Sequence, residues 1–146
     1  MSETTPTTLT LPCLGASFRR ASRALTQRYD DALRRLDLRA TQFTLLQVLS
    51  RAGEVSQGEL GRMLAMDSTS LTRTLAILRR RRWVAKRRGA DGRERRLSLT
   101  RSGKAQLRRA LPHWKKQQER FRRQLGGKRW KDVLKWANQL ATTITQ

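Results

Sequence analysis

The sequence has almost none of the residues on which metal sites and many enzymes depend. Cys13 is the only cysteine and His113 the only histidine among 146 residues, so one chain supplies neither a disulfide nor the usual Cys and His ligands of structural zinc. It pairs no nucleophile with a base and has no glycine-rich phosphate loop. We therefore expect no metal, no cofactor and no enzymatic activity.

Long apolar runs and acidic residues are scarce as well. No apolar run approaches the roughly 18 residues of a membrane-spanning helix, and the Ser/Thr/Pro-rich start has Glu3 where a signal peptide carries basic charge. A cytoplasmic protein is expected. The 11 acidic residues are outnumbered by 33 Lys and Arg, and the net charge of +22 predicts a polyanionic partner, with nucleic acid as the leading class. An anionic membrane is the lesser alternative, because it favours a basic amphipathic anchor and the basic residues lie mostly outside one such helix.

Apolar periodicity predicts helices with one small β-hairpin among them. Ser56 and Glu59 are spaced as a capping box, in which each side chain bonds the backbone amide of the other residue. Pro112 is expected to bend or break its helix. The stripe from Leu107 to Leu125 repeats by four and three, which is typical of a helix that packs on a partner. The expected elements are a helix over 18–36, a helix from the cap Thr41 to Gly53, a helix over 57–66, a helix capped by Asp67 or Ser68, strands over 84–88 and 93–99, a helix capped by Thr100, and a helix over 130–144.

The order of these elements predicts a mainly α chain with a small β-hairpin. Two helices joined by a tight turn at Met66 and Asp67, followed by a basic hairpin, match a winged helix-turn-helix. We expect residues 41–99 to form that DNA-binding region and residues 1–12 to be a flexible segment. Residues 13–40 and 100–146 are expected to form N- and C-terminal dimerisation helices.

The helix after Asp67 is the predicted recognition helix, which enters the major groove of DNA. Its exposed start offers short hydroxyls and one guanidinium, which suit phosphate oxygens and base edges. The same residues also cap solvated helices, so the adjoining basic hairpin decides in favour of DNA. The predicted contacts on this helix are Ser68, Thr69, Ser70, Thr72 and Arg73.

The hairpin and the end of that helix form a dense basic run. Residues 79–96 hold ten Lys and Arg against only Asp91 and Glu94, whereas ordinary solvated surfaces mix both signs. Phosphate binding therefore explains the run better than solvent exposure alone. The predicted DNA contacts of the hairpin are Arg87, Arg88, Arg93 and Arg95.

Four segments of the chain resemble regulators of the MarR family. They are Leu60-Gly-Arg-Met-Leu-Ala, Ser68-Thr-Ser-Leu-Thr-Arg-Thr-Leu, Asp91-Gly-Arg93-Glu-Arg-Arg96 and Leu99-Thr-Arg-Ser-Gly103. The resemblance extends from Leu14 to about Leu140. It implies a homodimer, joined through its terminal helices, that binds pseudo-palindromic double-stranded DNA. Such a regulator usually represses transcription until a small ligand or an oxidant intervenes.

The resemblance also implies roles for single residues of the hairpin. Arg93 matches the residue at the tip of the wing that enters the minor groove, where concentrated negative potential attracts a guanidinium. Asp91 matches the residue that orients the wing through an arginine, with Arg73 or Arg96 as its partner. A plain salt bridge within the hairpin is the alternative for Asp91.

Two further hypotheses concern how such a regulator is released from DNA. Cys13 lies just before the first helix and resembles the reactive cysteine of the family's peroxide-sensing branch, although the alignment places Gly15 at that position; an ordinary thiol is the alternative. A small aromatic ligand is the second hypothesis. Its candidate pocket residues, which otherwise belong to the core, are Phe43, Trp83, His113, Trp114, Trp130 and Trp136.

Two functions from different classes fit these features. The first is a homodimeric, sequence-specific transcriptional regulator that associates with the bacterial nucleoid. The second is a packaging or RNA-associated protein that binds nucleic acid without reading its sequence. Net charge does not separate the two functions, whereas the ratio of operator affinity to random-duplex affinity does.

Overall fold

A computed structural model describes residues 10–145 of the chain. It confirms the predicted mainly helical fold with a small β-sheet, and most of the expected flexible segment 1–12 lies outside the described residues. The elements are α1 (Leu14–Leu33), a 3-10 turn η1 (Arg34–Leu36), α2 (Ala40–Ala52), β1 (Val55–Ser56), α3 (Gln57–Leu64), α4 (Ser68–Arg80), β2 (Val84–Arg88), β3 (Arg95–Leu99), α5 (Arg101–Leu125) and α6 (Gly127–Ile144).

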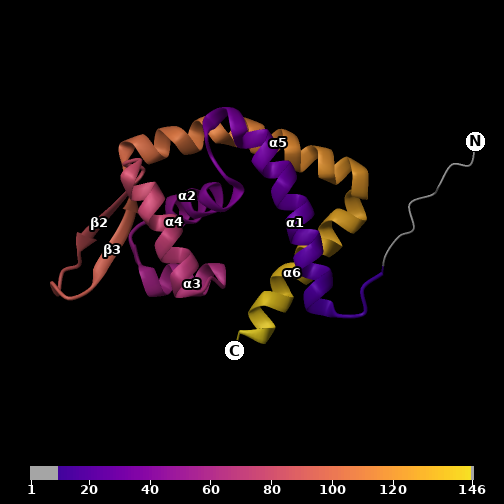
Figure 1. Cartoon of the computed structure of the whole chain (residues 1–146), viewed down its shortest axis with the longest axis horizontal. Coiled ribbons are helices and arrows are strands. Elements are labelled where there is room, and N and C mark those ends of the chain that lie inside the picture. Colours follow the sequence, from indigo (N-terminus) through magenta and orange to yellow (C-terminus); the bar gives the residue numbers. More distant parts are fainter. Residues whose placement is uncertain (1–9, 146) are drawn as a thin grey trace, which may run out of the picture.

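The elements form an arch with α5 as its upper beam (Figure 1). One end of α5 carries a lobe of α2, α3, α4 and the sheet, and the other end carries α1 and α6. No helix within residues 10–145 is long and apolar enough to cross a membrane.

The hydrophobic core lies inside the lobe. Its fully buried side chains are leucines from every helix of the lobe and from β3, and α5 adds Leu107 and Ala110 from above. Gln106, which is also buried, donates from Nε2 to the carbonyl oxygen of Leu36 at 2.9 Å, so its amide is not left unpaired. By contrast, α1 buries only Leu33 and α6 buries no residue. Packing within one chain therefore accounts for the lobe but not for α6.

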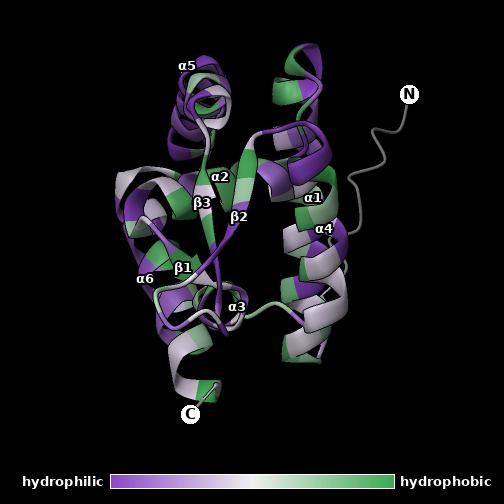
Figure 2. Ribbon diagram, turned by 90° about the vertical axis from the view of Figure 1, so that its left-hand side faces the viewer, coloured by the Kyte–Doolittle hydropathy of each residue, from purple (hydrophilic) through white to green (hydrophobic). Residues whose placement is uncertain are grey.

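The sheet has three antiparallel strands in the order β1-β3-β2. The hairpin of β2 and β3 was predicted, whereas the two-residue strand β1 was not, because so short a segment carries no periodic signal. Leu97 is the central partner, opposite Val55 of β1 and Lys86 of β2. Figure 2 shows both long strands changing from hydrophobic residues near the lobe to hydrophilic residues toward the hairpin turn. The hairpin is thus anchored at its base and charged at its tip.

Two local predictions are wrong. Thr41 does not cap α2: the helix begins at Ala40, its N-cap is Arg39, and the Asp30 carboxylate accepts from the Ala40 amide at 2.7 Å. Pro112 does not break α5, which runs without interruption from residue 101 to residue 125. Pro112 and Arg108 are both exposed, so the carbonyl that the missing amide would have bonded faces water.

Four element ends also differ from the predicted ones. The first helix begins at Leu14 and the last at Gly127, each earlier than expected, and the third helix ends at Leu64. The second strand of the hairpin begins at Arg95 and not at residue 93. Periodicity locates an apolar face well, but it does not locate the first or last turn of a helix.

Candidate nucleic-acid interface

The turn between α3 and α4 is built by capping interactions that the sequence announces. The predicted capping box is confirmed: the Glu59 amide donates to Ser56 Oγ at 3.1 Å, and the Ser56 amide donates to Glu59 Oε2 at 2.7 Å. The α3 helix ends at Ala65 in the left-handed conformation, with φ of 49°. Asp67 then caps α4, and its Oδ1 accepts from the Ser70 amide at 2.8 Å. A tight helix-turn-helix results.

The predicted recognition helix α4 presents polar residues on its free face. Its buried side chains are Leu71, Leu75 and Leu78, which pack this helix against the lobe. The face away from the core carries the predicted contact residues Ser68, Thr69, Ser70, Thr72 and Arg73, and all five are exposed.

Gln57 is a residue of this face that the sequence reasoning missed. Its Nε2 donates to Thr72 Oγ1 at 2.8 Å and so joins the start of α3 to the exposed face of α4. Gln57 and Thr72 are 15 positions apart, and nothing local in the sequence signals their contact.

The tip of the hairpin, called the wing from here on, is organised by Asp91. Its Oδ1 accepts from the backbone amides of Arg93 and Glu94, both at 3.1 Å, and Gly92 supplies the positive φ of 70° that the turn requires. The amides of Glu94 and Arg93, in that order, hold the pKa of Asp91 below its ordinary value. The carboxylate is therefore ionised at neutral pH and fixes the turn that carries Arg93.

Arg96 anchors the wing to the helix-turn-helix. Its Nη1 lies 3.2 Å from Glu59 Oε2 and 3.3 Å from Glu94 Oε2, and its Nη2 donates to the Glu54 carbonyl at 3.0 Å. Glu59 thus serves both the α3 cap and the wing, and the Ser56 amide is the main cause that holds the pKa of Glu59 low.

The expected arginine partner of Asp91 is not found in this geometry. Among residues 10–145, no ion pair joins Asp91 to Arg73 or Arg96. Backbone amides satisfy its carboxylate, while Arg96 is engaged by Glu59 and Glu94.

The tip of the wing exposes the remaining predicted DNA contacts. Arg87, Arg88, Arg93 and Arg95 are all exposed. Within the described residues, no ion pair neutralises any of them. Four guanidinium groups on one hairpin form a surface that suits phosphate oxygens.

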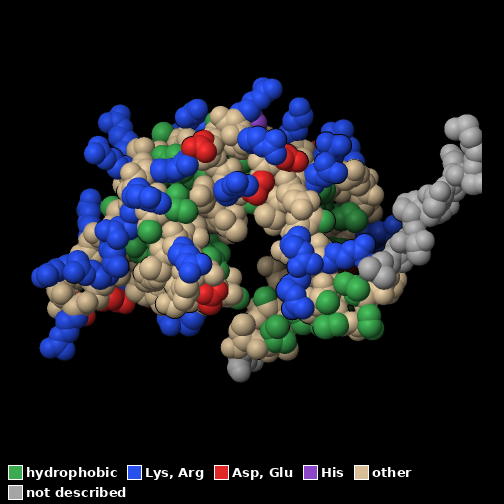
Figure 3. All heavy atoms as spheres, in the orientation of Figure 1, with side chains coloured by type: hydrophobic (Ala, Val, Ile, Leu, Met, Phe, Trp, Pro, Cys, Tyr) green, Lys and Arg blue, Asp and Glu red, His purple; other side chains and the backbone are tan. Residues whose placement is uncertain are grey.

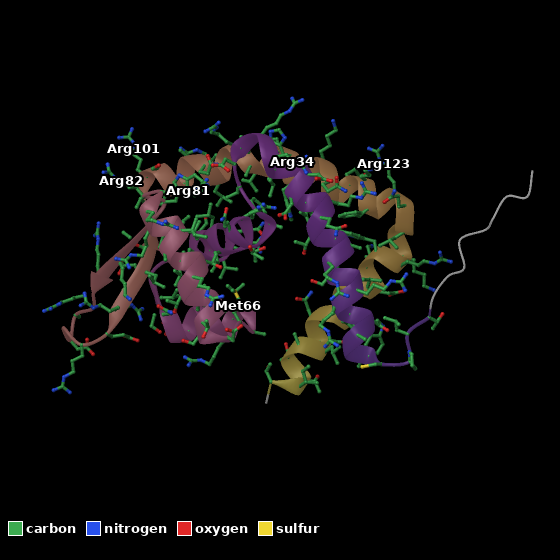
Figure 4. The ribbon with its side chains drawn as sticks, viewed as in Figure 1. Arg34, Met66, Arg81, Arg82, Arg101 and Arg123 are labelled. Atoms are coloured by element: carbon green, nitrogen blue, oxygen red, sulfur yellow. The ribbon has the colours of Figure 1, made fainter. Side chains whose placement is uncertain are left out.

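A second set of contacts joins the end of α4 to the rest of the arch (Figure 4). Arg81 Nη2 lies 2.8 Å from Asp37 Oδ2, and its guanidinium carbon lies 5.0 Å from the centre of the Trp83 ring. Thr100 caps α5 as predicted, with its Oγ1 accepting from the Gly103 amide at 3.0 Å. The same hydroxyl donates to the Arg82 carbonyl at 2.6 Å. These bonds fix the wing and α4 relative to α5.

Comparison with known proteins decides the family. The MarR family profile matches residues 36–94. The transcriptional regulator MosR of M. tuberculosis, in complex with DNA, is 35% identical with a TM-score of 0.82, over 91% of this chain and 96% of that chain. The chain belongs to the MarR family. The predicted lack of enzymatic activity is thereby confirmed, because MarR proteins are DNA-binding transcriptional regulators.

Two other relatives extend the likeness. A mutant form of MarR of E. coli, complexed with operator DNA, is 21% identical and has a TM-score of 0.78, and the match covers 87% of this chain and 92% of that chain. At that identity the likeness concerns the fold. An uncharacterized HTH-type transcriptional regulator of Bacillus subtilis, YwoH, is 29% identical over 80 residues, which are 55% of this chain and 58% of that protein.

The aromatic residues proposed for a MarR ligand pocket lie in different surroundings. Trp114 packs on Phe43 with a ring-centre distance of 5.7 Å, Trp83 contacts Arg81, and Trp136 is 67% exposed on α6. His113 is exposed and lines a hollow of about 600 Å³ with cationic residues of α5. These positions do not converge on one aromatic pocket.

Cys13 is free and exposed at the N-cap of α1. Tyr29, the only tyrosine, lies about 24 Å further along the same helix. It donates a hydrogen bond to Gln118 of α5 and packs edge-on against Phe121 at 5.4 Å. Cys13 and Tyr29 of one chain therefore do not meet.

Proposed function

We propose that this MarR-family chain forms a homodimer that binds a pseudo-palindromic operator and represses transcription until a small ligand or an oxidant intervenes. The observation that carries the proposal is the common direction of two features. The start of α4 and the tip of the wing both lie at the lower end of the lobe, away from α5 (Figure 1). One duplex lying against that end meets both.

Each feature suits a different part of the duplex. The start of α4 brings hydroxyls and the positive end of a helix to the major groove, where Ser70 and Thr72 reach base edges. The wing places Arg93 in the adjacent minor groove, and Arg87, Arg88 and Arg95 on phosphates. Asp91 orients the wing through the turn amides, and Arg96 through Glu59.

The terminal helices supply the dimer interface of the proposal. Large apolar side chains are exposed on both helices, among them Leu14 at 61%, Trp136 at 67% and Ile144 at 72%. Figure 3 shows hydrophobic side chains gathered over the free ends of α1 and α6. A second copy buries this surface, so residues 13–40 and 100–146 act as dimerisation segments around the DNA-binding region 41–99.

Release from the operator requires a site that is coupled to α4. A hollow of about 620 Å³ lies where α1, α2 and the end of α4 meet, and its lining includes Arg34, Asp37, Gln42 and Arg81. A small aromatic acid bound there competes with Asp37 for Arg81 and so shifts α4 relative to α1. Cys13 at the start of α1 is the site for an oxidant, where a charged or bridged sulfur perturbs the dimer interface.

The proposal is tested by separating residues that anchor the backbone from residues that read bases. For about eight neutralised phosphates, the slope of log K against log salt is about −7. Arg87→Ala is expected to reduce that slope by about one unit and to weaken all duplexes equally. Ser70→Ala is expected to keep the slope and to change the preference between duplexes. An Arg87→Ala variant that changes the preference and keeps the slope contradicts the assignment.

A further inference from the structure

A second basic surface covers the outer side of α5, outside the operator-binding end. The helix carries nine Lys and Arg and a single acid, Glu119. All nine basic side chains are exposed. Glu119 pairs with Arg122 at 3.0 Å and Arg123 at 3.2 Å, and no other basic residue of α5 takes part in an ion pair of the described chain.

Helical geometry gathers much of this charge into one stripe. Successive residues are about 100° apart around an α-helix. Leu107, Ala110 and Trp114 therefore share the side that faces the core. On the opposite side, five cations lie within about 60° of one another. This group, called the outer stripe, consists of Arg101, Lys104, Arg108, Lys115 and Arg122.

The outer stripe faces away from the proposed operator. In Figure 4, Arg101 and Arg123 lie along the upper edge of the molecule, whereas Met66, in the helix-turn-helix turn, lies at the opposite end. Figure 3 shows basic side chains along that upper edge as well as on the wing. A straight duplex against α4 and the wing does not reach them. An operator that neutralises about eight charges leaves most of the +22 of each chain unneutralised.

The chemistry of the stripe selects a rigid polyanion over a membrane surface. Surface-bound amphipathic helices insert large apolar side chains beneath their basic residues. The only exposed large apolar residue of α5 is Leu125, at its very end. The 25 residues of α5 span about 37 Å, which is close to the 34–36 Å of one turn of duplex DNA.

We infer that the outer stripe of α5 is a second, sequence-independent DNA-binding surface, and that the protein bridges two duplexes. One duplex is the operator on α4 and the wing, and the other lies along α5. The inference goes beyond the proposed operator contact. It adds a bridging activity, in which a bound regulator holds a distant segment of DNA through phosphate contacts alone.

The test is a sandwich capture with short duplexes. An immobilised operator duplex of about 25 base pairs is saturated with protein, washed, and offered a labelled random duplex of the same length at about 0.15 M salt. Duplexes so far below the persistence length of about 150 base pairs do not wrap around the protein. The stripe variant carries Arg101→Gln, Lys104→Gln, Arg108→Gln and Lys115→Gln. A matched variant loses the same charge from α6, through Lys128→Gln, Arg129→Gln, Lys131→Gln and Lys135→Gln.

The wild-type protein and the α6 variant are expected to capture the second duplex, and the stripe variant to lose about tenfold of that capture. All three are expected to remain on the operator, and circular dichroism with a thermal melt checks that each is folded. Operator retention without second-duplex capture by the wild type overturns the inference and leaves the proposed function intact. Equal capture by the stripe variant overturns it as well. Binding to phosphatidylglycerol vesicles that depends on the stripe, without duplex capture, assigns the surface to membranes and refutes the bridging activity.

Discussion

Gly103→Ala tests how the wing is joined to α5. A Cβ atom at this position would lie 2.1 Å from the carbonyl oxygen of Trp83, 2.9 Å from its carbonyl carbon and 3.1 Å from its Cα. All three are backbone atoms, which do not move aside as a flexible side chain does. The Trp83 carbonyl also accepts from the Thr100 amide at 3.1 Å. The methyl group therefore forces the base of the wing and the start of α5 apart.

The size of the effect follows from two opposing contributions. Replacing glycine by alanine inside a helix stabilises it by about 1 kcal/mol, whereas overpacking costs about 1–3 kcal/mol. Because the closest contact is so short, we expect the upper end of that cost and a net loss of about 2 kcal/mol. Gly58→Ala in α3 is the matched control: its Cβ comes no nearer than 3.7 Å to Arg62 Nη1, so it is expected to be neutral or to stabilise by up to about 1 kcal/mol.

The assay is equilibrium urea unfolding of the variants at one fixed protein concentration, because the stability of a dimer depends on concentration. Gly103→Ala is expected to lower the midpoint and Gly58→Ala to leave it unchanged or raise it. The reasoning is refuted if Gly103→Ala is as stable as the wild type while Gly58→Ala behaves as expected.

Three other perturbations address the wing and the dimer. Arg96→Ala removes the link from the wing to Glu59 and is expected to speed amide hydrogen exchange in the hairpin, whereas Arg95→Ala weakens DNA binding without that change; equal exchange in both variants contradicts the anchor. Trp136→Glu places a charge in the apolar surface of α6 and is expected to convert the dimer to a monomer in light scattering at micromolar concentration, and a monomeric wild type contradicts the dimer. Backbone amides depress the pKa of Asp91, so its stabilisation of the turn is fully present above its ordinary pKa of 3.8 and is lost as the pH falls below that value. Amide exchange of the turn from pH 6 to pH 3 checks this, and protection lost already near pH 6 opposes it.

Local rules were sufficient for much of the fold. Ser56 with Glu59, Asp67 and Thr100 each bond a backbone amide three residues away, and such short-range patterns are legible in a sequence. Capping also has competitors that the sequence does not reveal. Thr41 is a sound candidate for an N-cap, but the Asp30 carboxylate bonds the Ala40 amide from ten positions away and the helix begins earlier.

The candidate site was predicted in composition but not in its connections. The exposed hydroxyls of α4 and the arginines of the wing follow from periodicity and charge. The contacts that position them are long-range: Arg96 reaches Glu59 across 37 positions, and Arg81 reaches the Asp37 backbone across 44. Which of the many arginines pairs with which acid depends on the folded arrangement, and sequence spacing does not encode it.

The most direct test of the central claim is the specificity with which α4 and the wing read DNA. A duplex selected from a random library by the protein itself is compared with a scrambled duplex of the same composition, by equilibrium binding at about 0.15 M salt. A sequence-specific regulator is predicted to prefer the selected duplex by about 10³-fold or more, and Thr72→Ala to reduce that preference. A selection without enrichment, or an affinity ratio near one, contradicts the account.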